Sequence, residues 1–217
     1  MSSLAPTDRP LRKDAERNRV RILDAAGELF SQRGLGVTLD DIARHAGVGV
    51  GTVYRRFADK ELLIDALFEQ RLESMYAIAA AALELDDPWD GFVYFFQHGS
   101  ELQARDRGLK ELLTCSAHGG GCVVEARERL RAMVTQLFDR AKAAGVLRAD
   151  ADPFDAPLIS FMVGAVMDRS RDVEPDLWRR YLQIVLDGLR PCAATSLPAD
   201  ALSSDKLDAV LRRPAAR

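Results

Sequence analysis

The segment from Thr38 to Phe57 reads TLDDIARHAGVGVGTVYRRF, and it decides the fold. Thr38 suits a helix N-cap, and Asp41 follows three residues later, as in a capping box. Gly47 adopts positive φ at little cost, and it separates a short helix that ends near residue 46 from a second one that starts near Val50. Two short helices joined by a glycine-containing turn are typical of a helix-turn-helix, whose second helix fits the major groove of DNA.

The flanking segments have the periodicity of longer helices. A helix is predicted from Ala15 to Arg33, with Ile22, Ala26, Leu29 and Phe30 on one face. Another is predicted to begin after Asp59, a residue that favours N-caps, and to continue to about Leu85. The short helix pair therefore lies between two amphipathic helices.

Three pieces of this region, ILDAAGELFSQRG, TLDDIARHAGV and GTVYRRFADKELL, lie in order between Ile22 and Leu63. Together they resemble the N-terminal domain of the TetR family of bacterial repressors. The resemblance implies a homodimer of all-helical subunits. Each subunit would have a three-helix DNA-binding head and a larger C-terminal domain whose small-molecule effector typically releases the DNA.

The resemblance also implies roles for single residues of the head. Thr38 would contact a phosphate at a helix N-terminus, and Lys60 would contact another at the start of the next helix. Thr52 and Tyr54 would lie on the recognition helix, with the Tyr54 hydroxyl at the DNA backbone. A two-fold dimer presents two such helices, which predicts a pseudo-palindromic double-stranded operator.

The recognition helix departs from the family pattern at three positions. Gly49 and Val50 stand where the family often has a Ser-Lys pair, so a side-chain cap and one cation are missing. Val50 can offer apolar contact to a thymine methyl group instead. Arg56 replaces the usual Tyr or His, and Arg55 and Arg56 restore positive charge one turn later. We expect the usual docking with an unusual sequence preference.

Less specific interpretations of these residues stay open at this point. Tyr54 could be a buried core residue, and Arg55 and Arg56 could form a solvated face. Residues 1–14, with Arg9, Arg12 and Lys13, are predicted to be a flexible basic arm, which is either a plain tail or a segment that reaches a minor groove.

The remainder of the chain is predicted to be helical as well, because no segment shows the alternation of a β-strand. The fold class is therefore all-α with about nine helices. The predicted parts are the arm (1–14), the helix-turn-helix domain (15–75, with its motif at 38–57), the regulatory and dimerisation domain (76–191) and a mostly disordered tail (192–217).

Two clusters beyond the head are candidates for binding. Aromatic residues gather at the predicted start of one helix, and either a ligand pocket or ordinary core packing accounts for them; the candidates are Trp89, Phe92, Phe95, Phe96 and His98. The segment CSAHGGGC brings Cys115, His118 and Cys122 close in sequence. A metal-responsive or redox-responsive site is one interpretation, but the spacing is not a standard zinc set, and a plain loop is the other. We therefore predict no cofactor and no bound metal.

The last two predicted helices favour a dimer interface. The stretch PLISFMVGAVM (157–167) is apolar on nearly all sides, which indicates burial on both faces. The final helix carries Tyr181 and Ile184 on one side and Trp178 and Leu182 on another. The resemblance adds that these helices pair with their mates as a four-helix bundle.

The distribution of charge agrees with a protein that has a basic DNA-binding domain and a separate acidic domain. The net charge is −3, but residues 1–60 carry 11 Lys and Arg against 8 Asp and Glu, a basic front on an acidic remainder. No catalytic motif of a common enzyme class is present, so we predict that the protein is not an enzyme. We also predict a cytoplasmic protein without membrane contact. The alternative is a helical interaction module that has lost DNA binding.

Overall fold

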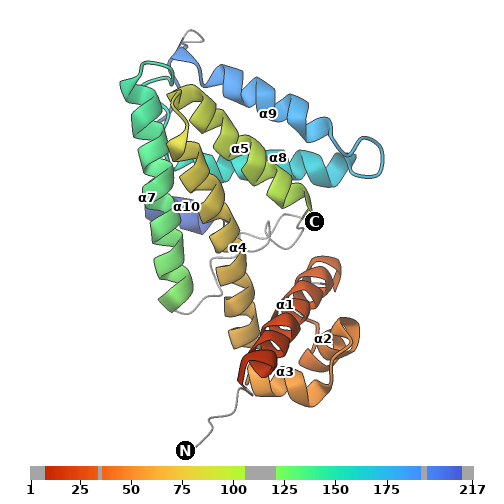
Figure 1. The fold of residues 1–217 in the computed structure, drawn as a ribbon. Coiled ribbons are helices and arrows are strands. Elements are labelled where there is room, and N and C mark those ends of the chain that lie inside the picture. Colours follow the sequence, from red (N-terminus) through yellow and green to blue (C-terminus); the bar gives the residue numbers. More distant parts are fainter. Residues whose placement is uncertain (1–7, 34–35, 106–120, 192–194, 212–217) are drawn as a thin grey trace, which may run out of the picture. The chain divides into compact units, whose positions relative to one another are not determined.

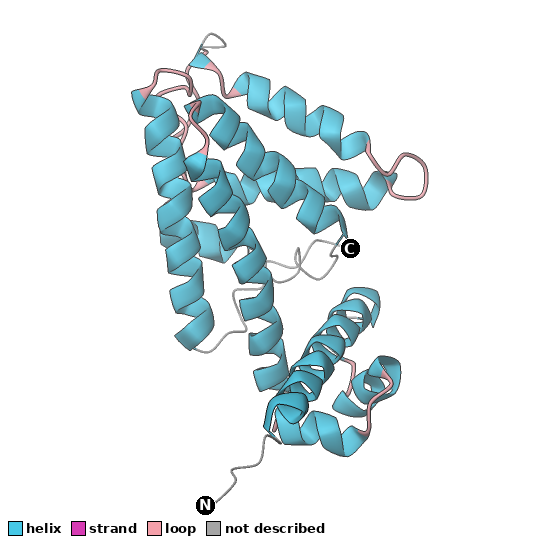
Figure 2. Ribbon diagram, in the orientation of Figure 1, coloured by secondary structure: helices cyan, strands magenta, loops and turns pink. Residues whose placement is uncertain are grey.

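The computed structural model describes residues 8–33, 36–105, 121–191 and 195–211, and these residues form nine α-helices and no strand (Figures 1 and 2). The helices are α1 (Asp8–Arg33), α2 (Leu39–Ala46), α3 (Val50–Arg56), α4 (Lys60–Glu84), α5 (Pro88–Arg105), α7 (Gly121–Ala143), α8 (Asp155–Ser170), α9 (Leu177–Gly188) and α10 (Ser204–Leu211). The predicted all-α fold class is confirmed. No helix in the described ranges is both long enough and apolar enough to cross a membrane.

The chain divides into two compact units, Met1–Leu67 and Phe68–Arg217. The division falls inside α4, so the first turns of this helix belong to the first unit and the remainder to the second. The sequence places the boundary at residue 75, further along the same helix. No linker separates the two units.

Helix α1 begins at Asp8 and not at Ala15, so part of the predicted basic arm is helical. Pro10 made this segment look irregular. It lies in the first turn of α1, where backbone N–H groups have no partner within the helix, and proline is tolerated there. Residues 1–7 lie outside the described part of the chain.

The first unit is built on the apolar face of α1. Ile22, Leu23 and Ala26 are fully buried, and α2 contributes Ile42 and Ala43 to the same core. Val53 completes it as the only buried residue of α3. The helix-turn-helix is thus held against α1 by a small set of close-packed side chains.

The second unit has a larger core that α4, α5, α7, α8 and α9 share. Helices α8 and α9 pack on each other, and α5 contacts α7, α8 and α9. The largest fully buried side chains of this core are Trp178, Phe92, Phe138, Leu182 and Leu186.

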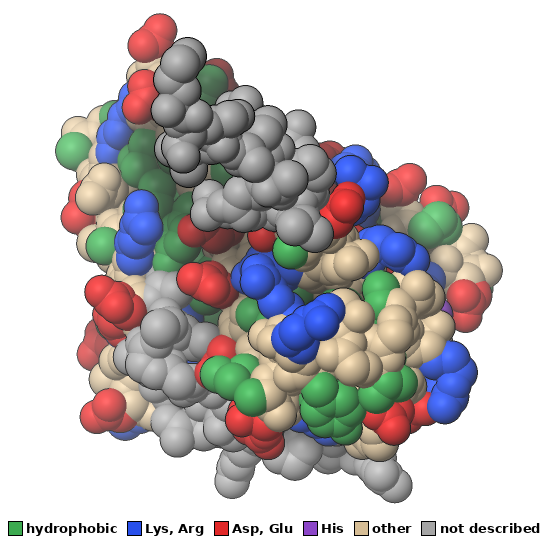
Figure 3. All heavy atoms as spheres, turned by 60° about the horizontal axis from the view of Figure 1, so that its bottom comes forward, with side chains coloured by type: hydrophobic (Ala, Val, Ile, Leu, Met, Phe, Trp, Pro, Cys, Tyr) green, Lys and Arg blue, Asp and Glu red, His purple; other side chains and the backbone are tan. Residues whose placement is uncertain are grey.

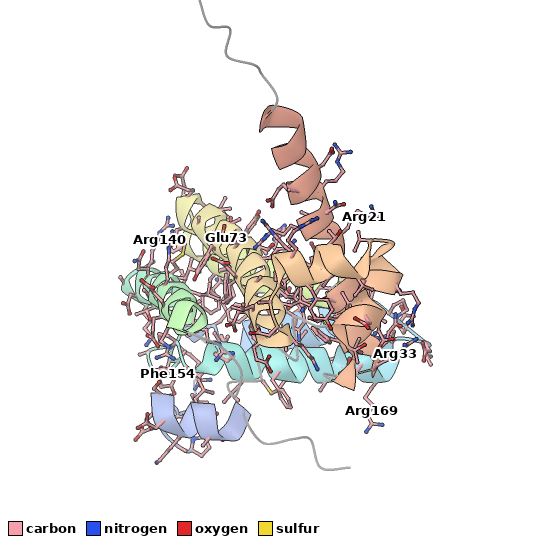
Figure 4. The ribbon with its side chains drawn as sticks, turned by 90° about the horizontal axis from the view of Figure 1, so that it is seen from below. Arg21, Arg33, Glu73, Arg140, Phe154 and Arg169 are labelled. Atoms are coloured by element: carbon pink, nitrogen blue, oxygen red, sulfur yellow. The ribbon has the colours of Figure 1, made fainter. Side chains whose placement is uncertain are left out.

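The end of α4 and the start of α5 approach each other closely. Gly91 of α5 is buried, and a Cβ at this position would overlap the carbonyl oxygen of Ala82. Arg140 of α7, labelled in Figure 4, donates hydrogen bonds to the carbonyl oxygens of Leu83, Leu85 and Asp86. One carbonyl in the last turn of α4 and two that follow the helix therefore find a donor that the helix itself does not supply.

The predicted disordered tail contains the helix α10. Leu207 is only 4% exposed, and the Arg131 guanidinium of α7 donates to Ser204 Oγ at the start of α10 (3.1 Å). The tail's content of Ala, Ser, Pro and Asp predicts disorder, but one buried leucine in an eight-residue helix is enough to anchor it. The prediction of a mostly disordered tail therefore does not hold for residues 204–211.

The segment before α10 is held by what we call the C-terminal clasp, formed by Arg148, Asp150, Thr195 and Leu197. Arg148 Nη2 donates to the carbonyl oxygen of Thr195 (2.7 Å) and to Asp150 Oδ2 (2.9 Å). The Leu197 N–H donates to the same Asp150 oxygen (3.1 Å). The clasp joins the loop after α7 to the segment that leads into α10.

Acid should weaken the clasp. The hydrogen bonds from Arg148 and from the Leu197 N–H hold the pKa of Asp150 well below its ordinary value of 3.8. A carboxyl group with a lowered pKa in the folded state stabilises the protein above its unfolded pKa, and this contribution is lost as the pH falls toward the folded value. We expect wild type to melt at a higher temperature than Asp150→Asn at about pH 7, with the difference shrinking below about pH 4.

Thermal denaturation across this pH range measures the effect, with Asp172→Asn as the control at an exposed aspartate. A melting difference between wild type and Asp150→Asn that stays constant down to about pH 2 would show that Asp150 does not act through its charge.

Candidate nucleic-acid interface

Helix α2 begins with the predicted capping box. Thr38 Oγ1 accepts from the Asp41 N–H (3.2 Å), and the Asp41 carboxylate accepts from the Thr38 N–H (3.3 Å) and hydroxyl (2.7 Å). These bonds from Thr38, with a smaller contribution from Arg44, lower the pKa of Asp41. The single hydroxyl proton of Thr38 is therefore directed to Asp41, and a phosphate contact through this hydroxyl would require it to rotate away.

The turn between α2 and α3 has the left-handed residue that the sequence predicts. Gly47 has φ 62°, and its N–H and that of Val48 bond back to the last carbonyls of α2. A side chain with Cβ would be strained in this conformation. The turn then leads directly into Gly49, the N-cap of α3, which makes no side-chain capping bond.

Helix α3 presents one face to solvent. Val53 is fully buried, whereas Val50 and Tyr54 are 43% and 50% exposed. The alternative that Tyr54 is a core residue is therefore wrong. Thr52 is half-buried. Figure 3 turns this end of the first unit toward the reader, and hydrophobic and basic side chains lie interspersed on it.

The two arginines that end α3 are both exposed. Arg56 Nη2 lies 3.7 Å from Glu16 Oε2 of α1, in an ion pair between exposed groups. Such pairs contribute little to stability and break easily. Arg55 and Arg56 are thus solvated, as the alternative interpretation expects, and they are also available to a polyanion.

Helix α4 begins at Lys60, after Asp59. Asp59 Oδ1 accepts from the Leu62 N–H (2.8 Å), which confirms the predicted cap. Lys60 Nζ lies 5.9 Å from the centre of the Phe30 ring, and its side chain is half-buried. The ammonium group is thus within the range of a cation–π contact with this ring.

Profiles of known protein families match both units. The profile of the bacterial regulatory proteins of the tetR family matches residues 22–67, and that of the SbtR-like transcriptional regulator C-terminal domain matches residues 87–191. A TetR transcription regulatory protein from Mycobacterium vanbaalenii is 34% identical; the match covers 83% of this chain and 99% of that one, with a TM-score of 0.56.

The chain belongs to the TetR family. It is a DNA-binding transcriptional regulator with a helix-turn-helix. The TetR regulator SCO0520 from Streptomyces coelicolor is similar as well, at 31% identity over 80% of this chain and 98% of that one, with a TM-score of 0.56.

A curated relative matches a shorter part of the chain. An HTH-type transcriptional regulator of Staphylococcus aureus is 39% identical over 64 residues, 29% of this chain. The match spans about a third of that relative, 35% of its length.

The five predicted pocket residues lie on α5, and the four aromatic ones among them are buried in the core of the second unit. Phe92 stacks near Trp89 (5.5 Å between ring centres) and meets Phe138 edge-on (5.0 Å). Phe95 and Phe96 are also buried. His98 is half-buried and stacks on Tyr94, whose carbonyl oxygen lies 3.0 Å from Nδ1. These contacts match the interpretation as core packing.

A cavity that the sequence did not indicate lies where α5, α8 and α9 meet. Its volume is about 240 Å³, and Trp178, Met167 and Arg179 are among its lining residues. Arg179 lies over the Trp178 ring and donates to Glu101 (2.8 Å). The Arg179 hydrogen bond lowers the pKa of Glu101. The charges on this rim are largely paired with one another.

The metal and redox hypotheses concern residues that are mostly outside the described part of the chain. Cys115 and His118 lie within 106–120, and Cys122 lies in the first turn of α7 without a described side chain. Among the residues that the structure describes, no three His, Cys, Asp or Glu side chains form a group that could hold a metal ion.

Proposed function

We propose that the protein is a ligand-responsive homodimeric repressor that inserts α3 of each subunit into the major groove of a pseudo-palindromic operator. The observation that carries this proposal is the exposed face of α3, with Val50 and Tyr54 about half exposed on a helix whose opposite side is fully buried. A single helix fits the major groove, where base edges can be distinguished.

The side chains on this face support direct recognition of base edges, with charge contributing little to the choice of bases. Val50 offers apolar contact to a thymine methyl group, and Tyr54 offers a hydroxyl donor to a phosphate. Arg55, Arg56 and Lys60 add positive charge at the margin of the helix. We infer that base selection rests mainly on Val50 and Thr52, and that the other residues fix the position on the backbone.

The dimer is supported by an exposed apolar face on α8 and α9. Phe161 and Met162 of α8 are 43% and 50% exposed, and Tyr181 and Ile184 of α9 are 46% and 53% exposed. The opposite faces of both helices are buried within the subunit. Large apolar side chains gathered on two adjacent helices are typical of a protein interface, and two helices from each subunit would form a four-helix bundle.

We place the small-molecule effector in the second unit, as the family resemblance implies. Gln70 Oε1 of α4 is buried and has no hydrogen-bond partner among the described residues. A buried acceptor without a donor is costly. A donor group on the effector would satisfy it, which favours a ligand that carries at least one hydroxyl or amide.

Removal of the Tyr54 hydroxyl tests the docking of α3. We expect Tyr54→Phe to weaken binding to a selected operator by roughly 10- to 100-fold, the net contribution of one hydrogen bond from each of the two subunits. Folding should not change, because the side chain is half exposed. Titration of a labelled duplex, selected from a random library, measures the affinity.

Tyr94→Phe, which removes a hydroxyl from α5, is the matched control and should bind as wild type does. Equal affinities of Tyr54→Phe and wild type would remove Tyr54 from the interface. Absence of selective binding by wild type at low salt would contradict the proposed function as a whole and favour a helical interaction module.

A further inference from the structure

Helix α1 is tied to the helix-turn-helix by three side chains. Glu16 reaches Arg56 of α3 (3.7 Å), and Glu28 reaches His45 of α2 (2.7 Å). Arg21 lies between them in the sequence and makes a different kind of contact, because its partners are backbone carbonyl groups. The two outer ties join exposed side chains, whose pairing contributes little.

Arg21 binds the turn itself. Its Nη2 donates to the carbonyl oxygen of Ala46 (2.7 Å) and approaches that of Gly47 (3.4 Å). Ala46 ends α2, so the guanidinium satisfies a carbonyl that has no partner within the helix. It also places a positive charge at the negative end of the helix dipole. Figure 4 labels Arg21, which lies midway along α1.

The lack of a side chain at Gly47 suits both its backbone conformation and its closeness to Arg21. A Cβ at Gly47 would lie 3.1 Å from Arg21 Nη2. The glycine therefore permits positive φ and leaves room for the guanidinium. The positive φ of Gly47 and the hydrogen bond from Arg21 both constrain the few residues that separate α2 from α3.

The geometry of this turn determines how α3 is presented. Helix α3 has seven residues, a glycine N-cap without a side-chain bond, and Val53 as its one buried residue. Few contacts of its own fix its direction, so the turn must supply the constraint. A small displacement of a recognition helix weakens base contacts more than phosphate contacts, because base readout depends on matched donors and acceptors.

We infer that Arg21 is a positioning residue for sequence discrimination, which holds the α2–α3 turn and thereby sets α3 for base readout without contacting DNA itself. The inference rests on the proposed docking of α3. Its rival is that Arg21, whose side chain is exposed, contacts a phosphate directly.

The two roles differ in their salt dependence. A phosphate contact contributes about 0.9 to the slope of log affinity against log salt, whatever the sequence of the duplex. A positioning contact leaves this slope unchanged and affects only the selected operator. The ratio of operator affinity to random-duplex affinity therefore separates them.

The experiment compares full-length wild type with Arg21→Met and Arg21→Lys. We expect Arg21→Met to lower the ratio of operator to random-duplex affinity roughly tenfold, with an unchanged salt slope. Arg21→Lys keeps one donor and the charge, and we expect a smaller loss. Arg17→Met is the control, because it removes the same charge from an exposed position of α1 where Arg17 pairs with Asp14 (3.6 Å).

Affinities are corrected for the active fraction by stoichiometric titration, at a temperature where circular dichroism shows each variant folded. The inference would be overturned if folded Arg21→Met kept the wild-type discrimination between operator and random duplex. It would also be overturned if the salt slope fell by about two, the loss of one phosphate contact in each subunit. If both variants unfold, Arg21 acts on stability alone and the inference is wrong. Wild type without discrimination would instead refute the docking of α3, and the inference with it.

Discussion

A Met162→Glu, Ile184→Glu double variant should be monomeric at micromolar concentration and should bind the operator far more weakly than wild type. Both side chains lie on the exposed apolar face of α8 and α9, at 50% and 53% exposure. Burial of an exposed half of each side chain is worth about 1 kcal/mol, and two-fold symmetry counts every position twice. The loss is about 4 kcal/mol, a roughly thousandfold change in the dimer dissociation constant.

Analytical ultracentrifugation measures the dimer, and duplex titration measures the operator affinity. Val173→Glu is the control, since Val173 is 86% exposed in the loop between α8 and α9 and should tolerate the charge. A double variant that still sediments as a dimer would place the interface elsewhere. Circular dichroism shows whether the monomer stays folded, which we expect because the substituted side chains lie outside the core.

Gly91→Ala should destabilise the protein by about 3 kcal/mol, at the upper end of the usual cost of overpacking. The added methyl group would overlap the carbonyl oxygen of Ala82, a backbone atom that cannot turn aside as a side chain can. Arg140 holds carbonyl groups that follow Ala82 in the chain, through hydrogen bonds. We expect the melting temperature to fall by about 6–12 °C.

Gly99→Ala is the matched control on the same helix. Its Cβ would meet the terminal methyl of Met75 at 3.3 Å, and this flexible side chain can move. Alanine also favours helix over glycine by up to about 1 kcal/mol, so this variant should be neutral or slightly stabilised. A melting temperature of Gly91→Ala equal to that of wild type would show that α4 and α5 separate without cost.

Local chemistry is what made the head predictable. The capping box of Thr38 and Asp41, the positive φ of Gly47 and the cap at Asp59 each depend on residues within a few positions of one another. Periodicity then placed Ile22 and Leu29 inside. The exposure of Tyr54 stayed open in the sequence, and the structure decides it by burying Val53 and leaving Tyr54 half exposed.

Contacts between distant residues were not predictable. Arg21 and Ala46 are far apart in the sequence, and nothing in the composition of α1 marks one arginine among several. Phe92 and Phe96 illustrate a second limit, since an aromatic run at helical spacing suits a pocket and a core equally well. Leu207 illustrates a third, because a single buried side chain does not alter the composition of a tail.

The uncharged start of α3 predicts a weaker effect of salt on the proposed operator binding. Val50 makes no ionic contact with a phosphate, so fewer counterions leave the DNA than when a lysine stands at this position. Operator occupancy then changes less when the ionic strength around it rises. We expect a cell under osmotic stress, with concentrated cytosolic salts, to keep its regulated promoter more steadily occupied than a lysine at the first position of α3 would allow.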